Sequence, residues 1–315
     1  MDLVNHLTDR LLFAVPKKGR LHQACLDLLH GSDIQFHRYS RLDIALVKNL
    51  PIALIFLPAA DIPTFVSEGR VDLGITGQDT IAEYEAQFPP NDKTGVKEIL
   101  DLSFGRCKLQ VQAPENGSVK DPRDLIGKNV VTSFTNLTEA YFRKLEAEQD
   151  GETEANGAGE KKLRTNVKYV GGSVEAACAL GVADGIVDLV ESGETMRAAG
   201  LKAISTVMET GAWLISSKQP SNPELVERIR ARIQGVITAQ KYVLCTYNIK
   251  RDQLAAATKI APGRRAPTVN ALDDEGWVAV SVMIPNNVKG QIMDDLWDIG
   301  ARDILITKID NTRTV

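Results

Sequence analysis

Short apolar runs alternate with amphipathic segments along the first two thirds of the chain. Leu11–Val15 and Ile52–Leu57 have the length and composition of buried strands, and apolar residues at helical spacing from Leu21 to Leu29 predict a helix between them. The same pattern predicts strands at 71–77, 108–113, 129–133, 167–170 and 185–190, and helices at 61–68, 136–146, 173–180 and 194–199. Strands that alternate with helices indicate an α/β fold with a mostly parallel sheet, in which ligands bind at the carboxyl ends of the strands.

These elements are expected to form two lobes, because a second series of strands and helices begins near Cys107. We expect residues 1–106 together with 197–217 to form the first lobe and residues 107–196 the second, with a cleft between them. Residues 148–162 contain glycines and several glutamates but few large apolar side chains, which predicts an insertion on the surface.

The remaining part of the chain follows a Pro-containing segment, Lys218–Pro223, of the kind found at domain boundaries. A long helix is expected at 224–240. After it the pattern predicts strands at 242–247, 268–272, 277–284 and 304–309, and helices at 251–259 and 287–299. The order β-α-β-β-α-β is that of a ferredoxin-like domain, so residues 218–315 are expected to form one.

Composition narrows the class of protein. The 315 residues carry a formal net charge of −4, whereas nucleic-acid-binding domains usually have a basic excess, so no nucleic-acid partner is expected. No apolar run approaches the ~20 residues of a membrane helix, and the first ten residues lack the apolar core of a signal peptide, which predicts a cytoplasmic protein. The four cysteines are scattered singly and no histidine stands at metal-ligand spacing, so neither a disulfide framework nor a protein-held metal is expected.

Cations gather in the turn after the first strand. Lys17, Lys18 and Arg20, together with Gly19, follow a strand end, where they suit a polyanionic small substrate. A guanidinium grips a phosphate through two hydrogen bonds, whereas an ammonium acts as a mobile point charge. For Lys17 a solvated basic turn explains the sequence equally well.

The segment 183–196 carries the most specific chemistry. An apolar strand at 185–190 contains Asp188, and a turn of small residues at 192–195 leads into a helix. Backbone N–H groups in such a turn hold a phosphate, and a carboxylate just before it accepts hydrogen bonds from ribose hydroxyls. The alternative is that the carboxylates only cap the turn and the helix.

Six motifs in order resemble one family over nearly the whole chain. They are Ala14–Leu21, Val71–Asp79, Asp101–Leu109, Gly172–Ala177 with the segment at 183–196, Arg232–Ile237 and Ala266–Thr268. The chain resembles the long-form ATP phosphoribosyltransferases, the first enzymes of histidine biosynthesis, and the segment at 148–162 resembles a fungal variant. The resemblance implies a periplasmic-binding-protein-like catalytic core of two lobes and a regulatory ferredoxin-like domain.

The resemblance also implies a reaction and its ligands. ATP and phosphoribosyl pyrophosphate would react with Mg²⁺ to give N1-(phosphoribosyl)-ATP and pyrophosphate. Histidine would act as the inhibitor, and the protein would be a homohexamer built from dimers.

The site residues that the resemblance implies fall into three groups. Phosphoribosyl pyrophosphate would be bound by Asp188, Glu191, Ser192, Gly193, Glu194, Thr195, Lys17, Arg20 and Glu175, of which Asp188 and Arg20 are the catalytic candidates. ATP would be bound by Lys18, Gly19, Asp72, Gly74, Thr76, Gly77, Arg106 and Lys108. Histidine would be bound near Asn248, Thr268 and Ala301. For Glu175 the alternative is helix capping, and each of the histidine candidates has an ordinary turn or sheet role as its alternative.

Two other functions remain open on the sequence. The segment at 183–196 would serve a phosphoribosyltransferase for any base, and two lobes with a further domain also suit a non-catalytic amino-acid sensor. A binder without catalysis does not explain why a basic loop and a ribose-phosphate loop occur together.

Overall fold

The computed structural model describes residues 7–39, 42–151 and 162–313, and most of the expected insertion at 148–162 lies outside these ranges. The chain divides into two compact units: residues 1–26 with 35–226, and residues 27–34 with 227–315. The expected C-terminal domain therefore begins nearer to residue 227 than to 218. None of the helices in the described ranges is long and apolar enough to cross a membrane.

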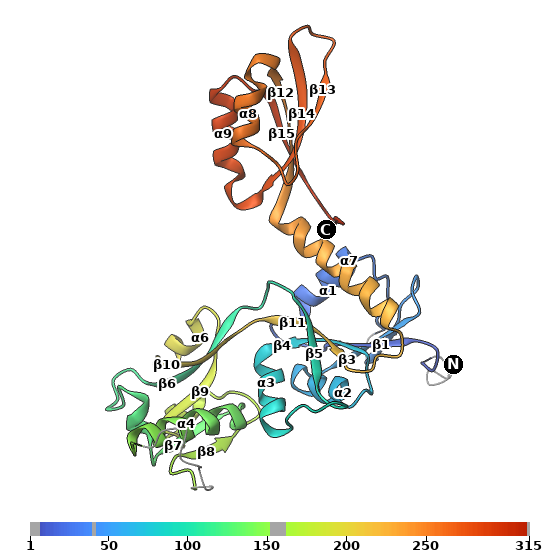
Figure 1. Ribbon diagram of the computed structural model, residues 1–315. Coiled ribbons are helices and arrows are strands. Elements are labelled where there is room, and N and C mark those ends of the chain that lie inside the picture. Colours follow the sequence, from blue (N-terminus) through green and yellow to red (C-terminus); the bar gives the residue numbers. More distant parts are fainter. Residues whose placement is uncertain (1–6, 40–41, 152–161, 314–315) are drawn as a thin grey trace. The chain divides into compact units, whose positions relative to one another are not determined.

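The first unit contains two sheets (Figure 1). The first has the order β2-β3-β1-β4-β11-β5, and its middle strands β3, β1 and β4 are parallel. Its strands are β1 (Leu11–Pro16), β2 (Ile44–Leu46), β3 (Ile52–Leu57), β4 (Leu73–Gly77), β5 (Val96–Asp101) and β11 (Ala212–Ser217). Its helices are α1 (His22–Gly31), α2 (Ile62–Ser67) and α3 (Gln78–Gln87). Phe13, Ala14 and Val15 of β1 are fully buried, as the continuous apolar run of a central parallel strand requires.

The second sheet has the order β10-β6-β9-β7-β8. Its strands are β6 (Cys107–Pro114), β7 (Asn129–Thr132), β8 (Asn166–Tyr169), β9 (Gly185–Val190) and β10 (Leu201–Thr210), and the helices of this lobe are α4 (Thr135–Gln149), α5 (Ala176–Ala179) and α6 (Glu194–Ala198). Strands β9, β7 and β8 are parallel, so their carboxyl ends share one edge. Side chains from β6, β7, β9 and α4 form the core of this lobe.

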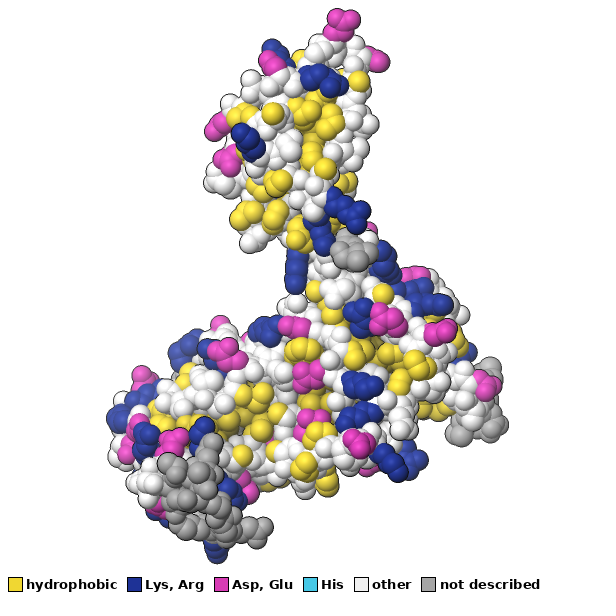
Figure 2. Space-filling model, in the orientation of Figure 1, with side chains coloured by type: hydrophobic (Ala, Val, Ile, Leu, Met, Phe, Trp, Pro, Cys, Tyr) yellow, Lys and Arg dark blue, Asp and Glu magenta, His cyan; other side chains and the backbone are white. Residues whose placement is uncertain are grey.

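The boundary between the two lobes differs from the expectation for residues 197–217. Strand β10 pairs with β6 and so belongs to the second sheet, whereas only β11 joins the first. The chain thus crosses from the first sheet to the second between β5 and β6, and it returns between β10 and β11. On the face drawn in Figure 2, Lys and Arg are interspersed with Asp and Glu over this unit, and no broad region of the described surface in that view has a single sign of charge.

The second unit carries the predicted βαββαβ order. It contains β12 (Tyr242–Lys250), α8 (Leu254–Ile260), β13 (Thr268–Ala271), β14 (Trp277–Pro285), α9 (Lys289–Asp298) and β15 (Arg302–Lys308), and most of the preceding α7 (Pro223–Lys241) belongs to it. The strands form an antiparallel sheet of order β13-β14-β12-β15. Helices α8 and α9 pack on one face of this sheet through Ala257 and Leu296, which leaves the other face uncovered by helices of the unit (Figure 1).

Helices α3 and α4 link the two lobes through one carboxylate. Glu83 of α3 accepts hydrogen bonds from the backbone N–H groups of Asn136 and Leu137 at 2.8 and 2.9 Å, and from the Asn136 side chain at 2.9 Å. These are the first N–H groups of α4, which have no partner inside their own helix. Glu83 therefore caps a helix that belongs to the other lobe.

The substitution Glu83→Gln should lower the free energy of unfolding by about 2 kcal/mol, because charged acceptors contribute more than neutral ones and an amide cannot serve all these donors. Thermal unfolding of the full chain would measure the loss. Glu85→Gln on the same helix is the control, and it should change the stability by less than about 0.5 kcal/mol. Equal losses in the two variants would contradict the capping role.

Candidate functional site

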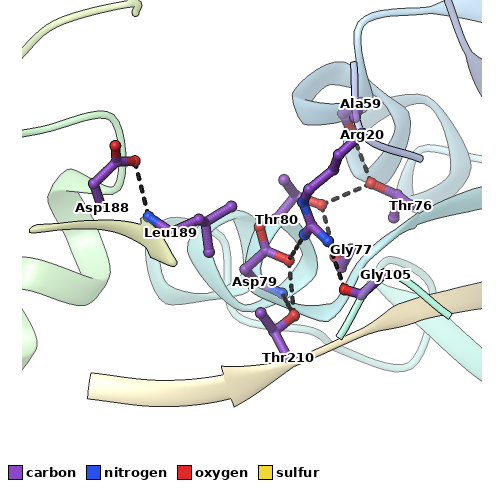
Figure 3. Close-up of polar contacts among 10 residues, drawn as sticks. All are labelled: Arg20, Ala59, Thr76, Gly77, Asp79, Thr80, Gly105, Asp188, Leu189 and Thr210. Atoms are coloured by element: carbon purple, nitrogen blue, oxygen red, sulfur yellow. Dashed lines mark hydrogen bonds and ion pairs between the residues drawn. The ribbon is translucent and has the colours of Figure 1, made fainter. Parts of the chain in front are cut away.

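Asp188 lies on β9, two residues before the strand ends. Its carboxylate accepts a hydrogen bond from the backbone N–H of Leu189 at 2.8 Å (Figure 3). Its backbone carbonyl accepts one from the Gln112 amide at 3.4 Å. Burial raises the pKa of Asp188 to about 6, and the negative charge of Glu175 adds to the rise. A half-buried carboxylate with a perturbed pKa beside a second acid is typical of a functional site.

The turn after β9 has the geometry that its glycine allows. Gly193 adopts a φ of 76° at the start of α6, a left-handed conformation that favours glycine. The Ser192 hydroxyl accepts a hydrogen bond from the N–H of Glu194 at 3.3 Å, and Thr195 lies in the first turn of the short helix. Arg197, which the sequence did not single out, folds back and donates to the carbonyl of Ser192 at 3.2 Å. A Cβ at Gly193 would stand 2.7 Å from this guanidinium, so glycine permits the approach.

Glu175 and Glu191 flank two successive elements of the second lobe, helix α5 and strand β9. Glu175 directly precedes α5, but its side chain makes no capping hydrogen bond there. Glu175 therefore does not cap the helix with its side chain. Its negative charge instead contributes to the raised pKa of Asp188. Glu191, directly after β9, is exposed.

Arg20 is held by a network of hydrogen bonds in the first lobe. Its guanidinium donates to the carbonyl of Gly105 at 2.5 Å and to the Asp79 carboxylate at 3.3 Å (Figure 3). The Asp79 side chain is only 2% exposed, and it also accepts a hydrogen bond from the Thr210 hydroxyl at 2.7 Å. Asp79, Gly105 and Thr210 were not among the predicted site residues. Arg20 is thus oriented by protein groups, while 25% of its side chain stays exposed.

The other predicted cations differ in how they are held. Lys17 forms an ion pair with Asp43 at 2.8 Å, which Arg38 also contacts, and these cations lower the pKa of that carboxyl. Lys108 pairs with Glu209 at 2.7 Å, and Arg106 pairs with Asp101. Exposed pairs of this kind are weak, so each cation can exchange its partner for a phosphate. Lys18 and Gly19 are exposed, and Gly19 has a φ of 89°.

The four residues predicted along β4 do not share one place. Asp72 precedes the amino end of the strand, where its carboxylate accepts hydrogen bonds from the N–H groups of Leu12 and Ser221, so it lies away from the edge where ligands were expected. A Cβ on Gly74 would stand 2.6 Å from Ile62, so this glycine serves the packing of α2. The buried Thr76 donates to the carbonyl of Ala59. Only Gly77 adjoins the Arg20 network, because a Cβ there would stand 2.1 Å from the Asp79 carboxylate.

The hydrogen-bond network of Arg20 and the turn after β9 both lie close to one buried residue. Cys107 begins β6, and burial raises the pKa of its thiol to about 11. The charges of Arg20 and Asp79 from the first lobe and of Glu191 and Asp188 from the second all act on this thiol. The strand register also brings both halves of the predicted site to the start of β6, because Thr210 pairs with Cys107 and Val190 pairs with Lys108. The raised pKa leaves the thiol protonated, which fits a core residue and not a nucleophile.

A hollow of about 250 Å³ lies on the face of the C-terminal sheet that its helices leave uncovered. Its lining consists of Thr246, Tyr247, Asn248, Asn270, Ala279, Val280, Ser281, Asp303 and Leu305. Of the three predicted histidine residues, Asn248 lines this hollow and donates to Asp303 at 3.0 Å, and Thr268 pairs in register with Ser281. Ala301 is fully buried before β15, so it does not line the hollow.

Comparison with known proteins decides the family. The family model described as ATP phosphoribosyltransferase matches residues 58–235, and the model described as HisG, C-terminal domain, matches residues 239–311. The ATP phosphoribosyltransferase of Yarrowia lipolytica is 63% identical over 313 residues, which cover 99% of this chain and 100% of that protein. That of Saccharomyces cerevisiae is 56% identical over 314 residues with the same coverage. The chain belongs to the ATP phosphoribosyltransferase family.

Family membership establishes a phosphoribosyltransferase of histidine biosynthesis, and it confirms the class of enzyme that the motifs predicted. Among solved structures, the ATP phosphoribosyl transferase (HisG:HisZ) complex from Thermotoga maritima has a TM-score of 0.56 at 22% identity, covering 71% of this chain and 96% of that chain. This likeness shows the fold alone, and it agrees with the expected α/β architecture.

The pKa of Asp188 generates a prediction on stability. Because the folded pKa of about 6 is raised, the folded protein binds this proton more tightly than the unfolded one. The ionised carboxylate therefore destabilises the fold above that pKa, and the destabilisation disappears as the pH falls toward the usual aspartate value of ~4. Asp188→Asn should raise the stability by about 2 kcal/mol at pH 8, and by much less at pH 4.5.

Thermal unfolding at the two pH values would test this. Asp184→Asn is the matched control, because Asp184 lies four residues earlier and accepts a hydrogen bond from the N–H of Asn129 at 3.0 Å. The control should be destabilised at both pH values. Loss of stability in Asp188→Asn at pH 8 would contradict the raised pKa.

Proposed function

We propose that the chain joins N1 of the adenine of ATP to C1 of phosphoribosyl pyrophosphate and releases pyrophosphate, as the first step of histidine biosynthesis. The observation that carries this proposal is that the Arg20 network and the turn after β9 lie at the same end of β6. Thr210, which binds Asp79, pairs in register with Cys107, and Val190, at the end of β9, pairs with the adjacent Lys108. A cationic group and a ribose-phosphate turn on facing lobes suit a reaction between two polyanions.

The chemistry needs positioning more than a base. The lone pair on adenine N1 forms the bond to C1 while the bond from C1 to the diphosphate oxygen breaks, and the N6 proton leaves once the ring is positively charged. No proton has to be removed before the attack, so no Ser-His-Asp arrangement is required. Catalysis then rests on alignment and on stabilising the departing charge.

The donor is proposed to lie at the carboxyl end of β9. Asp188 accepts hydrogen bonds from the ribose hydroxyls, with Glu175 beside it, and the negative charge of Asp188 favours the positive charge that develops at C1. The backbone N–H groups and hydroxyls of Ser192 to Thr195 hold the 5′-phosphate, with the carboxylates of Glu191 and Glu194 turned away. Arg197 adds a cation to this turn, because its guanidinium donates to the carbonyl of Ser192.

The phosphate chains are proposed to lie against the cations of the first lobe and of the crossover. Arg20 and Lys17 hold the diphosphate of the donor, and Lys18, Arg106 and Lys108 face the triphosphate of ATP. Gly19 and Gly77 allow the backbone to approach the nucleotide. We leave Asp72, Gly74 and Thr76 out of this site, because their side chains or packing are engaged within the first lobe.

Mg²⁺ fits this site as an ion bound mainly through substrate. Within residues 7–39, 42–151 and 162–313 no group of three His, Cys, Asp or Glu lies close enough to hold a metal. Mg²⁺ prefers phosphate oxygens and water with one or two carboxylates, and Asp188 and Glu175 would supply carboxylates at the donor end. When bound, it neutralises charge on the leaving diphosphate.

The C-terminal sheet is proposed to bind histidine as a feedback inhibitor. The hollow beside Asn248 offers the Asp303 carboxylate for an amino group, and the hydroxyls of Thr246 and Ser281 for a carboxylate or an imidazole. Thr268 would act from the adjoining strand. We also propose a homohexamer assembled from dimers, as the family resemblance implies.

The activity is tested by mixing the full chain with ATP, phosphoribosyl pyrophosphate and Mg²⁺ and following the ultraviolet absorbance of N1-substituted adenine. Asp188→Asn should lower kcat about 10²-fold, because it removes a charge aimed at the reacting carbon, whereas Asp184→Asn should keep near-normal turnover. Other nucleobases in place of ATP should give no product. Absence of the ATP product at every Mg²⁺ concentration would sink the proposed reaction.

The regulatory proposal is tested by histidine inhibition of the full chain. Asp303→Asn should raise the histidine concentration for half-inhibition at least tenfold, because the loss of a charged partner costs about 1.5–3 kcal/mol. Uninhibited turnover should stay unchanged. Asp303 has a φ of 51°, and asparagine tolerates this conformation. Asp298→Asn at the end of α9 is the control, and unchanged inhibition in Asp303→Asn would place the histidine site elsewhere.

A further inference from the structure

Two short segments carry the chain between the sheets of the first unit, and Arg20 is connected to both. Gly105 lies in the outgoing segment between β5 and β6, and its carbonyl accepts a hydrogen bond from Arg20 at 2.5 Å. Thr210 ends β10 at the returning segment and pairs in register with Cys107 of β6. Arg20 reaches Thr210 through the carboxylate of Asp79.

The hydrogen bonds around Thr210 fix the direction of its hydroxyl. The oxygen accepts the backbone N–H of Asp79 at 2.9 Å, and it stands 2.7 Å from the Asp79 carboxylate. An N–H can only donate, and a hydroxyl has one proton, so that proton points to the carboxylate. Thr210 is itself only 2% exposed. It therefore holds both the backbone and the side chain of Asp79 in one arrangement.

Asp79 in turn sets the position of the guanidinium. A buried carboxylate needs partners for its charge, and Arg20 at 3.3 Å is the cation that contacts it. The Thr210 hydroxyl and Arg20 share the same oxygen, Oδ1. A change in the position of Thr210 would therefore move the Asp79 oxygen to which Arg20 is bound.

We propose that Thr210 is a positioning residue for the transferase reaction. Its hydroxyl holds Asp79 so that the guanidinium of Arg20 faces the diphosphate of the donor. Because Thr210 lies where the chain returns from the second sheet to the first, the position of Arg20 also depends on that segment. This proposal rests on the proposed role of Arg20.

The test compares Thr210→Val, Thr210→Ser and Thr165→Val in the full chain. Valine keeps the shape of threonine but removes the hydroxyl, whereas serine keeps the hydroxyl. Thr165 is the matched control: it is 3% exposed, and its hydroxyl donates to the Glu146 carboxylate at 2.8 Å, away from Arg20 in the second lobe. Steady-state kinetics and melting temperatures are measured for each.

Thr210→Val should raise KM for phosphoribosyl pyrophosphate about tenfold, the low end of what a charged hydrogen bond contributes, while KM for ATP changes less than about twofold. Thr210→Ser should return KM to within about twofold of the original. Thr165→Val should lower the melting temperature without changing either KM. If Thr210→Val does not fold, Asp79→Asn replaces it, and the same shift in KM is expected.

Two results overturn the proposal. One is unchanged kinetics in Thr210→Val with a loss of melting temperature like that of Thr165→Val, because Thr210 would then be only structural. The other is a serine variant as defective as the valine variant. A wild-type chain without turnover would instead sink the proposed function. In that case calorimetry of pyrophosphate binding tests the positioning role of Thr210. Binding at least fivefold weaker in Thr210→Val than in the original chain supports this role, and equal binding overturns it.

Discussion

The arrangement of the two lobes in the first unit depends on how one buried negative charge is accommodated. The Asp79 carboxylate lies where the two segments that join the sheets run together, and it is kept there by a guanidinium from the loop after β1 and by a hydroxyl from the end of β10. A buried carboxylate that loses a partner is strongly unfavourable. The network therefore holds the crossover segments and Arg20 together. In the proposed function, the same hydrogen bonds that join the lobes would also orient a cation for the substrate.

Much of the fold could be predicted because its central strands are simple in sequence. Strands β1, β3 and β9 are apolar runs, and the βαββαβ order of the C-terminal domain follows from strands that alternate clearly between buried and half-buried residues. Strand β10 has no such pattern. Its pairing with β6 shifts register twice, between Ala203 and Ser205 and again between Thr206 and Met208, which breaks the period of two. No alternating pattern therefore indicates that residues 201–210 form a strand of the second lobe.

The candidate site also has one part that could be predicted from local sequence and one part that could not. The turn after β9 is contiguous in sequence, so the order strand, small-residue turn and helix was enough to place Asp188 on the strand and Gly193 in the turn. The partners of Arg20 are not contiguous, and Asp79 and Thr210 stand 131 positions apart, a separation that no local pattern connects. Asp72 was grouped with residues at the carboxyl end of β4, but it directly precedes the strand. Its carboxylate therefore lies at the opposite end from Gly77, where it binds the N–H groups of Leu12 and Ser221.

The raised pKa of Asp188 indicates how the two halves of the proposed site would each stabilise charge in the transition state. Burial makes the ionised carboxylate unfavourable in the free protein. Among the residues that the structure describes, its hydrogen-bond donor is the N–H of the adjacent Leu189. Ribose hydroxyls would supply donors, and positive charge at C1 would supply an attraction that grows as the bond to the diphosphate breaks. An interaction that strengthens toward the transition state accelerates the reaction more than one that is already satisfied in the ground state. In the proposed reaction Arg20 would be the complement. Its guanidinium is already oriented by Gly105 and Asp79, so little reorganisation would be required when the leaving group develops its charge.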